Sequence, residues 1–300
     1  MERKTQKPRP RRETESVSIQ WFPGHMTRTL RVMEKEIRTM DGVVQLLDAR
    51  IPRSSLNPEL VRITREKPRL YLLNKADLAD PEITARWIAY FKGNGNGCLA
   101  LDSRQKAKIP QVKNAIEAEL TELLARRASR GAAGARRMIM VVGIPNVGKS
   151  TFINSFAGSA HTKTADRPGV TRGKQWVTVG NYDLLDMPGV LWKKFGSQEV
   201  AGNLAFIGSI RDEVLDREEL AAALLGEIQR MYPEKLRERY HVSEEELSQT
   251  PYALLETIGR KRGCLIAGGE VDAGRIATML VNEFRSAKLG RISLERPEDL

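Results

Sequence analysis

The stretch that decides the fold is Gly143-Ile144-Pro145-Asn146-Val147-Gly148-Lys149-Ser150, which matches the pattern G-x4-G-K-[ST]. It directly follows the apolar run Met138–Val142, and residues 151–156 read as the start of a helix. In this context the pattern forms a phosphate-binding loop, because backbone N–H groups converge on phosphate oxygens at a helix N-terminus. The sequence therefore predicts a nucleotide phosphate site here; the alternative is a plain glycine turn between a strand and a helix.

Side chains in this loop have distinct expected roles. Lys149 supplies a point charge to the outer phosphates and is a candidate catalytic residue, and the Ser150 hydroxyl is an expected Mg²⁺ ligand. The loop residues expected to contact the nucleotide are Asn146, Val147, Gly148, Lys149, Ser150 and Thr151.

A second motif, Asn74-Lys75-Ala76-Asp77, closes the apolar run Leu70–Leu73. A carboxylate at Asp77 can accept from guanine N1–H and N2–H2 together, whereas adenine would leave it unpaired because adenine N1 is an acceptor. The motif predicts a guanine nucleotide, with Asn74, Lys75 and Asp77 as contacts. The alternative interpretation is a turn that caps the following helix.

The pattern D-x-x-G occurs twice, at Asp166–Gly169 and at Asp186–Gly189. Only the second ends an apolar strand, so Asp186 is expected near Mg²⁺, with a water molecule between them, and the Gly189 N–H near the γ-phosphate. Thr171 lies between the two and is the expected switch threonine, a catalytic residue that binds Mg²⁺ when a γ-phosphate is present. The alternative for Thr171 is a surface residue in a turn.

Apolar runs that alternate with helical patterns predict an α/β fold with a mostly parallel sheet. The expected strands are residues 42–48, 70–73, 98–101 and 138–142, with a hairpin of 176–179 and 182–185. Asp102 and Ser103 follow the third strand and are expected at the guanine edge through backbone N–H groups. Helical patterns at 198–210, 217–232, 251–262 and 272–288, the last ending near Gly290, predict a helical domain without strands.

The order of the motifs is the informative feature. In ordinary Ras-like GTPases the phosphate loop comes first, whereas here Asn74–Asp77 precedes Gly143–Ser150. We therefore predict a circularly permuted Ras-like P-loop GTPase domain. The arginine-rich segment Arg126–Arg137 is expected to be a flexible basic linker that joins the two ends of the unpermuted domain, because domain termini tend to lie close together. The predicted organisation is a basic disordered tail (1–18), the GTPase domain (19–196) and a helical RNA- or ribosome-binding domain (197–300).

Composition narrows the class of protein. The net charge is +11, which favours a polyanionic partner. The two cysteines exclude a four-cysteine zinc site and fit a reducing cytosol. No apolar run approaches the roughly 20 residues that span a bilayer, so we expect no membrane partner.

With these motifs in hand, the chain resembles the circularly permuted GTPases of the YlqF type, and within them the ribosome biogenesis GTPase A family. The matching segments are Trp21–Met26, Asp48–Pro52, Asn74–Asp77, Gly143–Ser150, Pro168–Arg172, Asp186–Gly189, Gly268–Asp272 and Phe284–Arg291. The resemblance implies a cytoplasmic factor that uses GTP and Mg²⁺, is monomeric off the ribosome, and acts late in assembly of the large ribosomal subunit and its rRNA. The basic tail before Ser18 departs from the family pattern.

Hydrolysis needs a group that orients the attacking water. Ras-like enzymes carry a glutamine after D-x-x-G, whereas this chain has Val190, which cannot hydrogen-bond water. The resemblance implies that His25 is the catalytic residue; the alternative is a cap for the helix that starts near Met26. Related GTPases also use an asparagine at the position of Asn146 to hold K⁺, and the alternative there is a loop asparagine satisfied by its own backbone.

Two other functions compete with large-subunit assembly. A small-subunit assembly GTPase would need an N-terminal barrel and a zinc module, for which the roughly 40 residues before the first expected strand and two cysteines are too few. The other alternative is a GTP-dependent switch that acts on another RNA or on a protein or membrane partner; the chain carries no lipidation motif that would favour a membrane.

Overall fold

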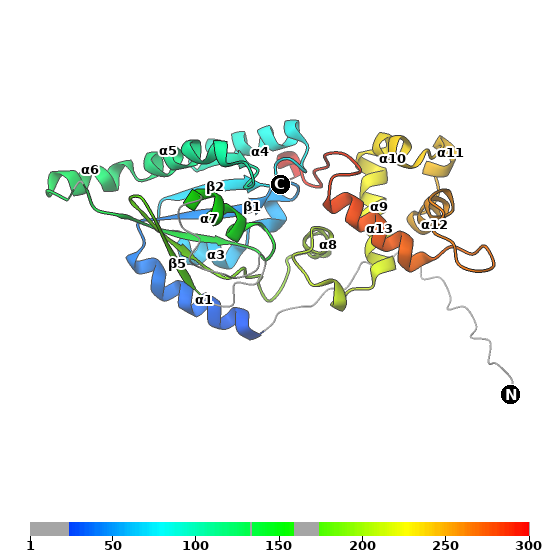
Figure 1. Ribbon diagram of the computed structural model, residues 1–300, viewed down its shortest axis with the longest axis horizontal. Helices are drawn as coiled ribbons and strands as arrows, with labels where there is room; N and C mark the ends of the chain where they lie inside the picture. Colours follow the sequence, from blue (N-terminus) through cyan, green and yellow to red (C-terminus); the bar gives the residue numbers. More distant parts are fainter. Residues whose placement is uncertain (1–23, 133, 159–173, 300) are drawn as a thin grey trace.

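The computed structural model describes residues 24–132, 134–158 and 174–299, which form a sheet-containing half and a helical half (Figure 1). One six-stranded sheet organises the first half. Its strands are β1 Gly42–Asp48, β2 Arg69–Asn74, β3 Gly97–Leu101, β4 Arg137–Gly143, β5 Gln175–Val179 and β6 Tyr182–Asp186. They run in the order β3-β2-β1-β4-β6-β5, all parallel except β5, which forms an antiparallel hairpin with β6.

The central strands are buried along their whole length. Every residue of β1 and β2 is buried, which is typical of parallel strands covered on both faces. The predicted α/β class, the four parallel strands and the hairpin are thereby confirmed. Parallel pairing of β1 with β4 brings the carboxyl ends of β2, β1, β4 and β6 to one edge, where ligands bind in open α/β sheets.

Helices cover both faces of this sheet. They are α1 Gly24–Glu36, η1 Ile37–Thr39, α2 Pro52–Ser55, α3 Pro58–Thr64, α4 Pro81–Gly93, η2 Lys106–Lys108, α5 Ile109–Glu119, α6 Thr121–Ser129 and α7 Lys149–Ala157. Figure 1 places α4 and α5 above the sheet and α1 and α3 below it. The sheet therefore has a protected interior, and its polar residues meet at the strand ends.

The basic linker predicted at residues 126–137 belongs to regular elements only at its two ends; its described residues 130–132 and 134–136 lie outside helices and strands. Helix α6 continues to Ser129, and β4 begins at Arg137. The arginines are held by carboxylates: Arg127 pairs with Asp41 at 2.5 Å, and Arg137 pairs with Glu117 at 3.1 Å. The two ends of the predicted linker thus continue α6 and lead into β4, and carboxylates on neighbouring elements match part of its positive charge.

The second half contains only helices among the described residues. These are α8 Gln198–Phe206, η4 Asp212–Val214, α9 Arg217–Met231, α10 Pro233–Tyr240, α11 Glu244–Leu247, α12 Pro251–Lys261, α13 Ala273–Arg285 and η5 Pro297–Asp299. Asp272 caps α13, since its carboxylate accepts from the Arg275 N–H at 2.9 Å. Helix α13 ends at Arg285 rather than near Gly290, because Ala287 (φ 55°) and Gly290 (φ 90°) adopt left-handed conformations.

The end of the chain returns to the sheet-containing half. The Leu294 N–H donates to the Arg50 carbonyl at 2.8 Å, and the Trp87 indole N–H donates to the Glu295 carbonyl at 3.0 Å. The division of the chain at residues 196 and 197 stays a prediction. Within the described ranges, no helix is long and apolar enough to cross a bilayer.

Candidate nucleotide site

The phosphate loop joins β4 to α7, and two of its glycines are required by close contacts. A Cβ at Gly148, where φ is +97°, would lie 2.4 Å from Asn74 Nδ2. A Cβ at Gly143 would lie 2.7 Å from the Leu46 carbonyl oxygen. Only glycine therefore lets the loop approach β1 and Asn74 this closely.

Asn74 connects the two predicted motifs. Its amide Nδ2 donates to the Val147 carbonyl at 2.7 Å, inside the phosphate loop. Its Oδ1 accepts from the backbone N–H of Ser103 at 3.0 Å and from the Ser103 hydroxyl at 2.7 Å. Because the Asn74 side chain is buried and uses both ends of its amide, it fixes the phosphate loop relative to the segment after β3.

Lys149 is a buried cation at the start of α7. In this structure its ammonium donates to the carbonyls of Gly143 (3.3 Å) and Ile144 (3.0 Å). Burial lowers the pKa of Lys149 to about 8, although the nearby carboxylate of Asp186 favours the charged form. A phosphate at this loop would give the ammonium a much stronger partner than two backbone carbonyls.

The segment after β6 is held against the phosphate loop. A Cβ at Gly189 would lie 2.7 Å from the backbone nitrogen of Pro145 and 2.9 Å from Lys149 Nζ, so this position also requires glycine. The Val190 carbonyl accepts from Asn57 Nδ2 at 2.8 Å, and the Val190 side chain is fully buried. Neither its chemistry nor its position lets this valine orient a water.

The guanine end carries charges that are paired and partly exposed. Arg104 donates to Asp77 at 2.6 Å and to Asp102 at 2.9 Å, and its side chain is 68% exposed. Hydrogen bonding from Arg104 lowers the pKa of Asp102. The amides of Ser103 and Arg104 already donate to Asn74 and to Asp102. If these two amides recognised the base, they would have to give up their hydrogen bonds to Asn74 and Asp102. Asp77 is therefore the strongest candidate for contacting guanine.

Lys75 lies beside a buried ion pair. It has a left-handed backbone (φ 59°), and its ammonium lies 3.1 Å from Asp48 Oδ2. Burial alone would raise the pKa of Asp48, but Arg50 and Lys75 hold it well below its usual range. Burial in turn lowers the pKa of Lys75, with Asp48 opposing. The segment Asp48–Pro52, one of those that resemble the family, thus holds the Lys75 ammonium in place through Asp48. The sequence alone did not predict this contact.

The phosphate loop also contacts the helical half. Asn146 Nδ2 donates to the Gly208 carbonyl at 2.7 Å, and the Ser209 hydroxyl donates to the Pro145 carbonyl at 2.8 Å. Arg285 at the end of α13 braces this turn by donating to the carbonyl of Phe206 at 2.8 Å. Sequence reasoning missed these three contacts because the partners are more than 60 positions apart, and only the quoted Phe284–Arg291 motif pointed to this region.

The remaining predicted residues are placed only in part. Thr171 lies outside the described residues. His25 belongs to the first turn of α1, and the next residue, Met26, accepts a hydrogen bond from the Leu191 N–H to its Sδ at 3.4 Å. The start of α1 therefore lies beside the segment that follows Gly189. Ser150 and Thr151 belong to the first turn of α7, as expected for a loop that leads into a helix.

A metal ion at this site would depend on the nucleotide. Among the residues placed by the structure, no group of three or more His, Cys, Asp and Glu side chains could hold a metal ion. Mg²⁺ typically uses one or two protein oxygens together with substrate phosphates. Asp186, close enough to Lys149 to affect its pKa, and Ser150 at the start of α7 fit that requirement.

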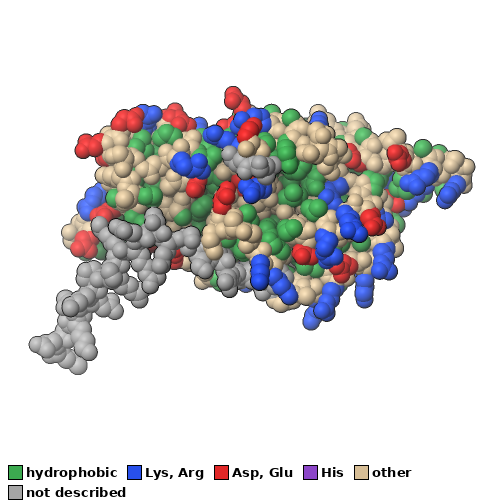
Figure 2. All heavy atoms as spheres, turned by 180° about the vertical axis from the view of Figure 1, so that it is seen from behind, with side chains coloured by type: hydrophobic (Ala, Val, Ile, Leu, Met, Phe, Trp, Pro, Cys, Tyr) green, Lys and Arg blue, Asp and Glu red, His purple; other side chains and the backbone are tan. Residues whose placement is uncertain are grey.

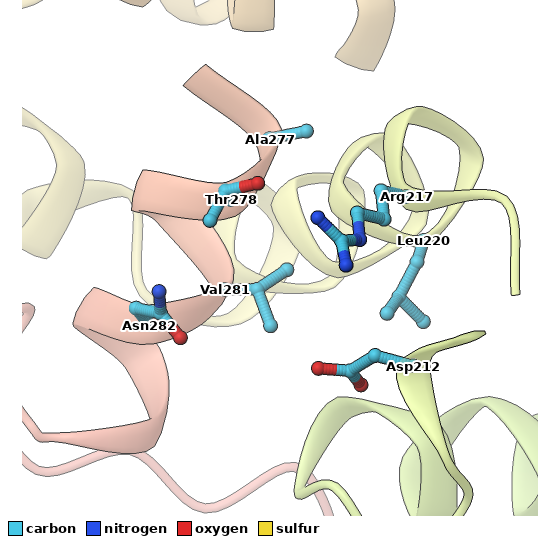
Figure 3. A pocket seen from close by; sticks show the side chains of 7 residues that line it. All are labelled: Asp212, Arg217, Leu220, Ala277, Thr278, Val281 and Asn282. Carbon is cyan, nitrogen blue, oxygen red and sulfur yellow. The ribbon is translucent and has the colours of Figure 1, made fainter. Parts of the chain in front are cut away.

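A small cavity of about 110 Å³ lies elsewhere, between η4, α9 and α13. Figure 3 shows Asp212 and Arg217 pointing into it from one side, with Val281 and Asn282 of α13 on the other. None of its lining residues belongs to the predicted nucleotide site.

Comparisons with known proteins agree with this geometry. A family model described as 50S ribosome-binding GTPase matches residues 138–250. Ribosome biogenesis GTPase A of Bacillus cereus is 40% identical over 282 residues, which cover 94% of this chain and 95% of that protein. Ribosome biogenesis GTPase A of Thermotoga maritima is 30% identical over 94% of this chain and 96% of that protein.

A solved structure shows the same arrangement. The GDP-bound structure of Thermotoga maritima YlqF superimposes with a TM-score of 0.61 at 26% identity, covering 90% of this chain and 100% of that one. Because the match covers both halves of the chain, the permuted order of the motifs is a property of the fold as well as of the sequence.

Proposed function

The chain belongs to the ribosome biogenesis GTPase A family, and we propose that this GTPase drives a late step of large (50S) subunit assembly and is stimulated by the ribosome. The observation that carries the nucleotide part is the Asn74 contact, which joins the guanine motif to the phosphate loop. The relatives' printed names support the ribosomal part. We assign the large (50S) subunit and its rRNA as the partner on the basis of the family model and of the chain's net positive charge.

In the proposed mechanism, Asp77 selects guanine and Lys149 stabilises the charge that builds on the β- and γ-phosphate oxygens. Ser150, Asp186 and Thr171 would hold Mg²⁺, which neutralises phosphate charge when bound. The ammonium of Lys149 now contacts two neutral carbonyls of its own loop, and a phosphate would offer it a charged acceptor instead.

We assign the orientation of water to His25, because Val190 is buried and apolar. The hydrogen bond from the Leu191 N–H to Met26 supports this assignment, since it joins the first turn of α1 to the segment that follows Gly189, the residue whose N–H we expect near the γ-phosphate. His25→Ala should lower kcat by the ~10²–10⁴-fold typical of a positioned acid or base while GDP affinity stays the same. Reduced affinity with unchanged kcat would make His25 the helix cap instead.

Asn146 is the proposed K⁺ ligand. Its Nδ2 is used by the Gly208 carbonyl, so Oδ1 is the side-chain atom that would face the cation. Turnover should then be faster in K⁺ than in Na⁺, and Asn146→Ala should remove this difference.

The decisive experiment for the function is sedimentation of the purified protein with large and small subunits, in GDP and in a non-hydrolysable GTP analogue. We expect association with large subunits that is stronger with the analogue, since switch segments follow the γ-phosphate. Equal binding in both nucleotide states, or to both subunits, would contradict the proposal. It would favour the alternative, a switch that acts on another RNA or on a protein or membrane partner.

A further inference from the structure

Helix α1 and the following turn η1 carry a row of cations on one face. Arg28, Arg31, Lys35 and Arg38 are spaced three, four and three residues apart and all are exposed. This spacing places side chains on one side of a helix. The opposite side is apolar and packs against the rest of the protein through the buried Met26, Met33 and Ile37 and the partly buried Leu30. We call the four cations the α1 stripe; it is about 15 Å long at 1.5 Å per residue.

The α1 stripe is not neutralised by the rest of the protein. None of its four cations forms an ion pair with a residue that the structure places. The two acidic residues of the helix face other cations: Glu34 pairs with Arg62 at 2.7 Å, and Glu36 pairs with Lys174 at 2.8 Å. Figure 2 shows Lys and Arg side chains projecting along the edge of the molecule where Figure 1 places α1.

Other arginine clusters are different, because carboxylates match most of their charge. In the helical half, Arg260 pairs with Glu256, Lys261 with Glu246, Arg262 with Glu283 and Arg285 with Asp212. Near the permuted junction, Arg127, Arg136 and Arg137 are also paired. In these two regions Arg126, Arg130, Lys288 and Arg291 form no ion pair among the described residues, whereas in the α1 stripe none of the four cations forms one.

We propose that the α1 stripe binds backbone phosphates of RNA, and that this contact is a route by which RNA acts on GTP hydrolysis. The inference rests on the proposed function for the identity of the RNA. When unpaired cations contact the phosphates of RNA, condensed counterions are released from the RNA. The entropy of this release favours binding and is not offset by the breaking of ion pairs within the protein. The stripe lacks exposed apolar side chains that would favour insertion into a lipid surface.

The coupling follows from the contacts at the other end of the helix. Met26, one residue after His25, accepts from the Leu191 N–H, and the preceding Val190 is tied to Asn57. Asn57 caps α3, which packs against α1. A partner that fixes α1 thus fixes the segment after Gly189 from two sides.

The test compares two variants with the same loss of charge. The first is R28Q/R31Q/K35Q/R38Q; glutamine has a helix propensity close to those of Arg and Lys, so α1 should persist. The control is K92Q/K106Q/R217Q/R275Q, four exposed cations spread over α4, η2, α9 and α13. Both variants are measured for binding to large subunits across a salt series, for GTP turnover alone and for turnover with large subunits.

We expect the stripe variant to flatten the slope of log K against log salt by about 3, close to the release of one counterion per phosphate contact, and the control to flatten it much less. Turnover without subunits should be unchanged in the stripe variant, whereas its stimulation by subunits should fall at least tenfold. Equal slopes in the two variants would overturn the inference while wild-type binding still supports the proposed function. Loss from the stripe variant of binding to anionic vesicles, with RNA binding intact, would also overturn it.

Discussion

The phosphate end and the guanine end of the site are built in opposite ways. At the phosphate end, Lys149 is buried, its pKa is lowered to about 8, and Gly148 and Gly189 leave no space for a Cβ. At the guanine end, Asp77 and Asp102 share the exposed Arg104. Close contacts fix the phosphate end, and its buried ammonium lacks an anionic partner of matching strength. At the guanine end, a bound base would have to replace Arg104 as the partner of Asp77. Changes at the first end should therefore affect chemistry most, and changes at the second should affect selectivity.

The strongest test of the phosphate end is Lys149→Ala. Removing a buried charge aimed at developing negative charge should lower kcat by about 10³-fold. Steady-state GTP turnover measures this effect, and Lys92→Ala, an exposed lysine of α4, is the control. A loss of less than tenfold would place the catalytic charge elsewhere.

At the guanine end, Asp77→Asn should lower GDP affinity by about 10²-fold, because one acceptor becomes a donor that faces guanine N–H groups. The same change should raise affinity for xanthosine diphosphate. Competition binding with both nucleotides measures the shift. Asp102→Asn is the control, because it removes the other carboxylate that contacts Arg104. If this variant also exchanged its preference from GDP to xanthosine diphosphate, Asp77 would not be the residue that recognises the base.

Asn74 lies between the two ends, and its removal tests whether they form one unit. Asn74→Ala leaves the Val147 carbonyl and the Ser103 donors without their buried partner, which should lower the free energy of unfolding by about 2 kcal/mol. Urea unfolding measures the change. Asn94→Ala is the control, since that exposed amide donates only to Tyr90. Equal effects would mean that the two ends are supported independently.

The smallest expected effect is on pH dependence. The nucleotide binds the ammonium form of Lys149, and the free protein loses that proton as the pH rises through about 8. GDP affinity should therefore be nearly constant below pH 7 and fall by up to tenfold per pH unit above about 8. Calorimetry in two buffers of different ionisation heat should show proton uptake on binding at pH 8.5. Affinity that is flat up to pH 9.5 would indicate an ordinary lysine pKa.

The sequence predicted the strands and the motif positions because both depend on local patterns. Residues 42–47 are apolar except for Gln45, Asp48 follows them, and the strand occupies the predicted range 42–48. The phosphate loop and Asn74–Asp77 are local as well, so their meeting at one sheet edge followed from the parallel order of the strands.

Contacts between distant segments could not be predicted in the same way. Helix α11 has four residues and three glutamates, too short for any periodicity. The pairing of the linker arginines could not be predicted, because composition says nothing about Asp41, which lies 86 positions from its partner Arg127. The links from Asn146 to Gly208 and from Arg285 to Phe206 depend on how the two halves pack. The positions of Thr171 and of the His25 side chain remain predictions.

The permuted order of the strands also sets a schedule for synthesis. A chain made from its N-terminus completes β1, β2 and β3, with Asn74–Asp77 and the segment after β3, before β4 and the phosphate loop exist. At 5–20 residues per second, about 2–10 s separate the completion of β3 at residue 101 from the synthesis of Lys149. During that interval β1 has an unpaired edge where β4 will later bind. The residues predicted to recognise guanine are therefore synthesised before the phosphate loop, so we expect the first three strands to pair before a complete nucleotide site exists.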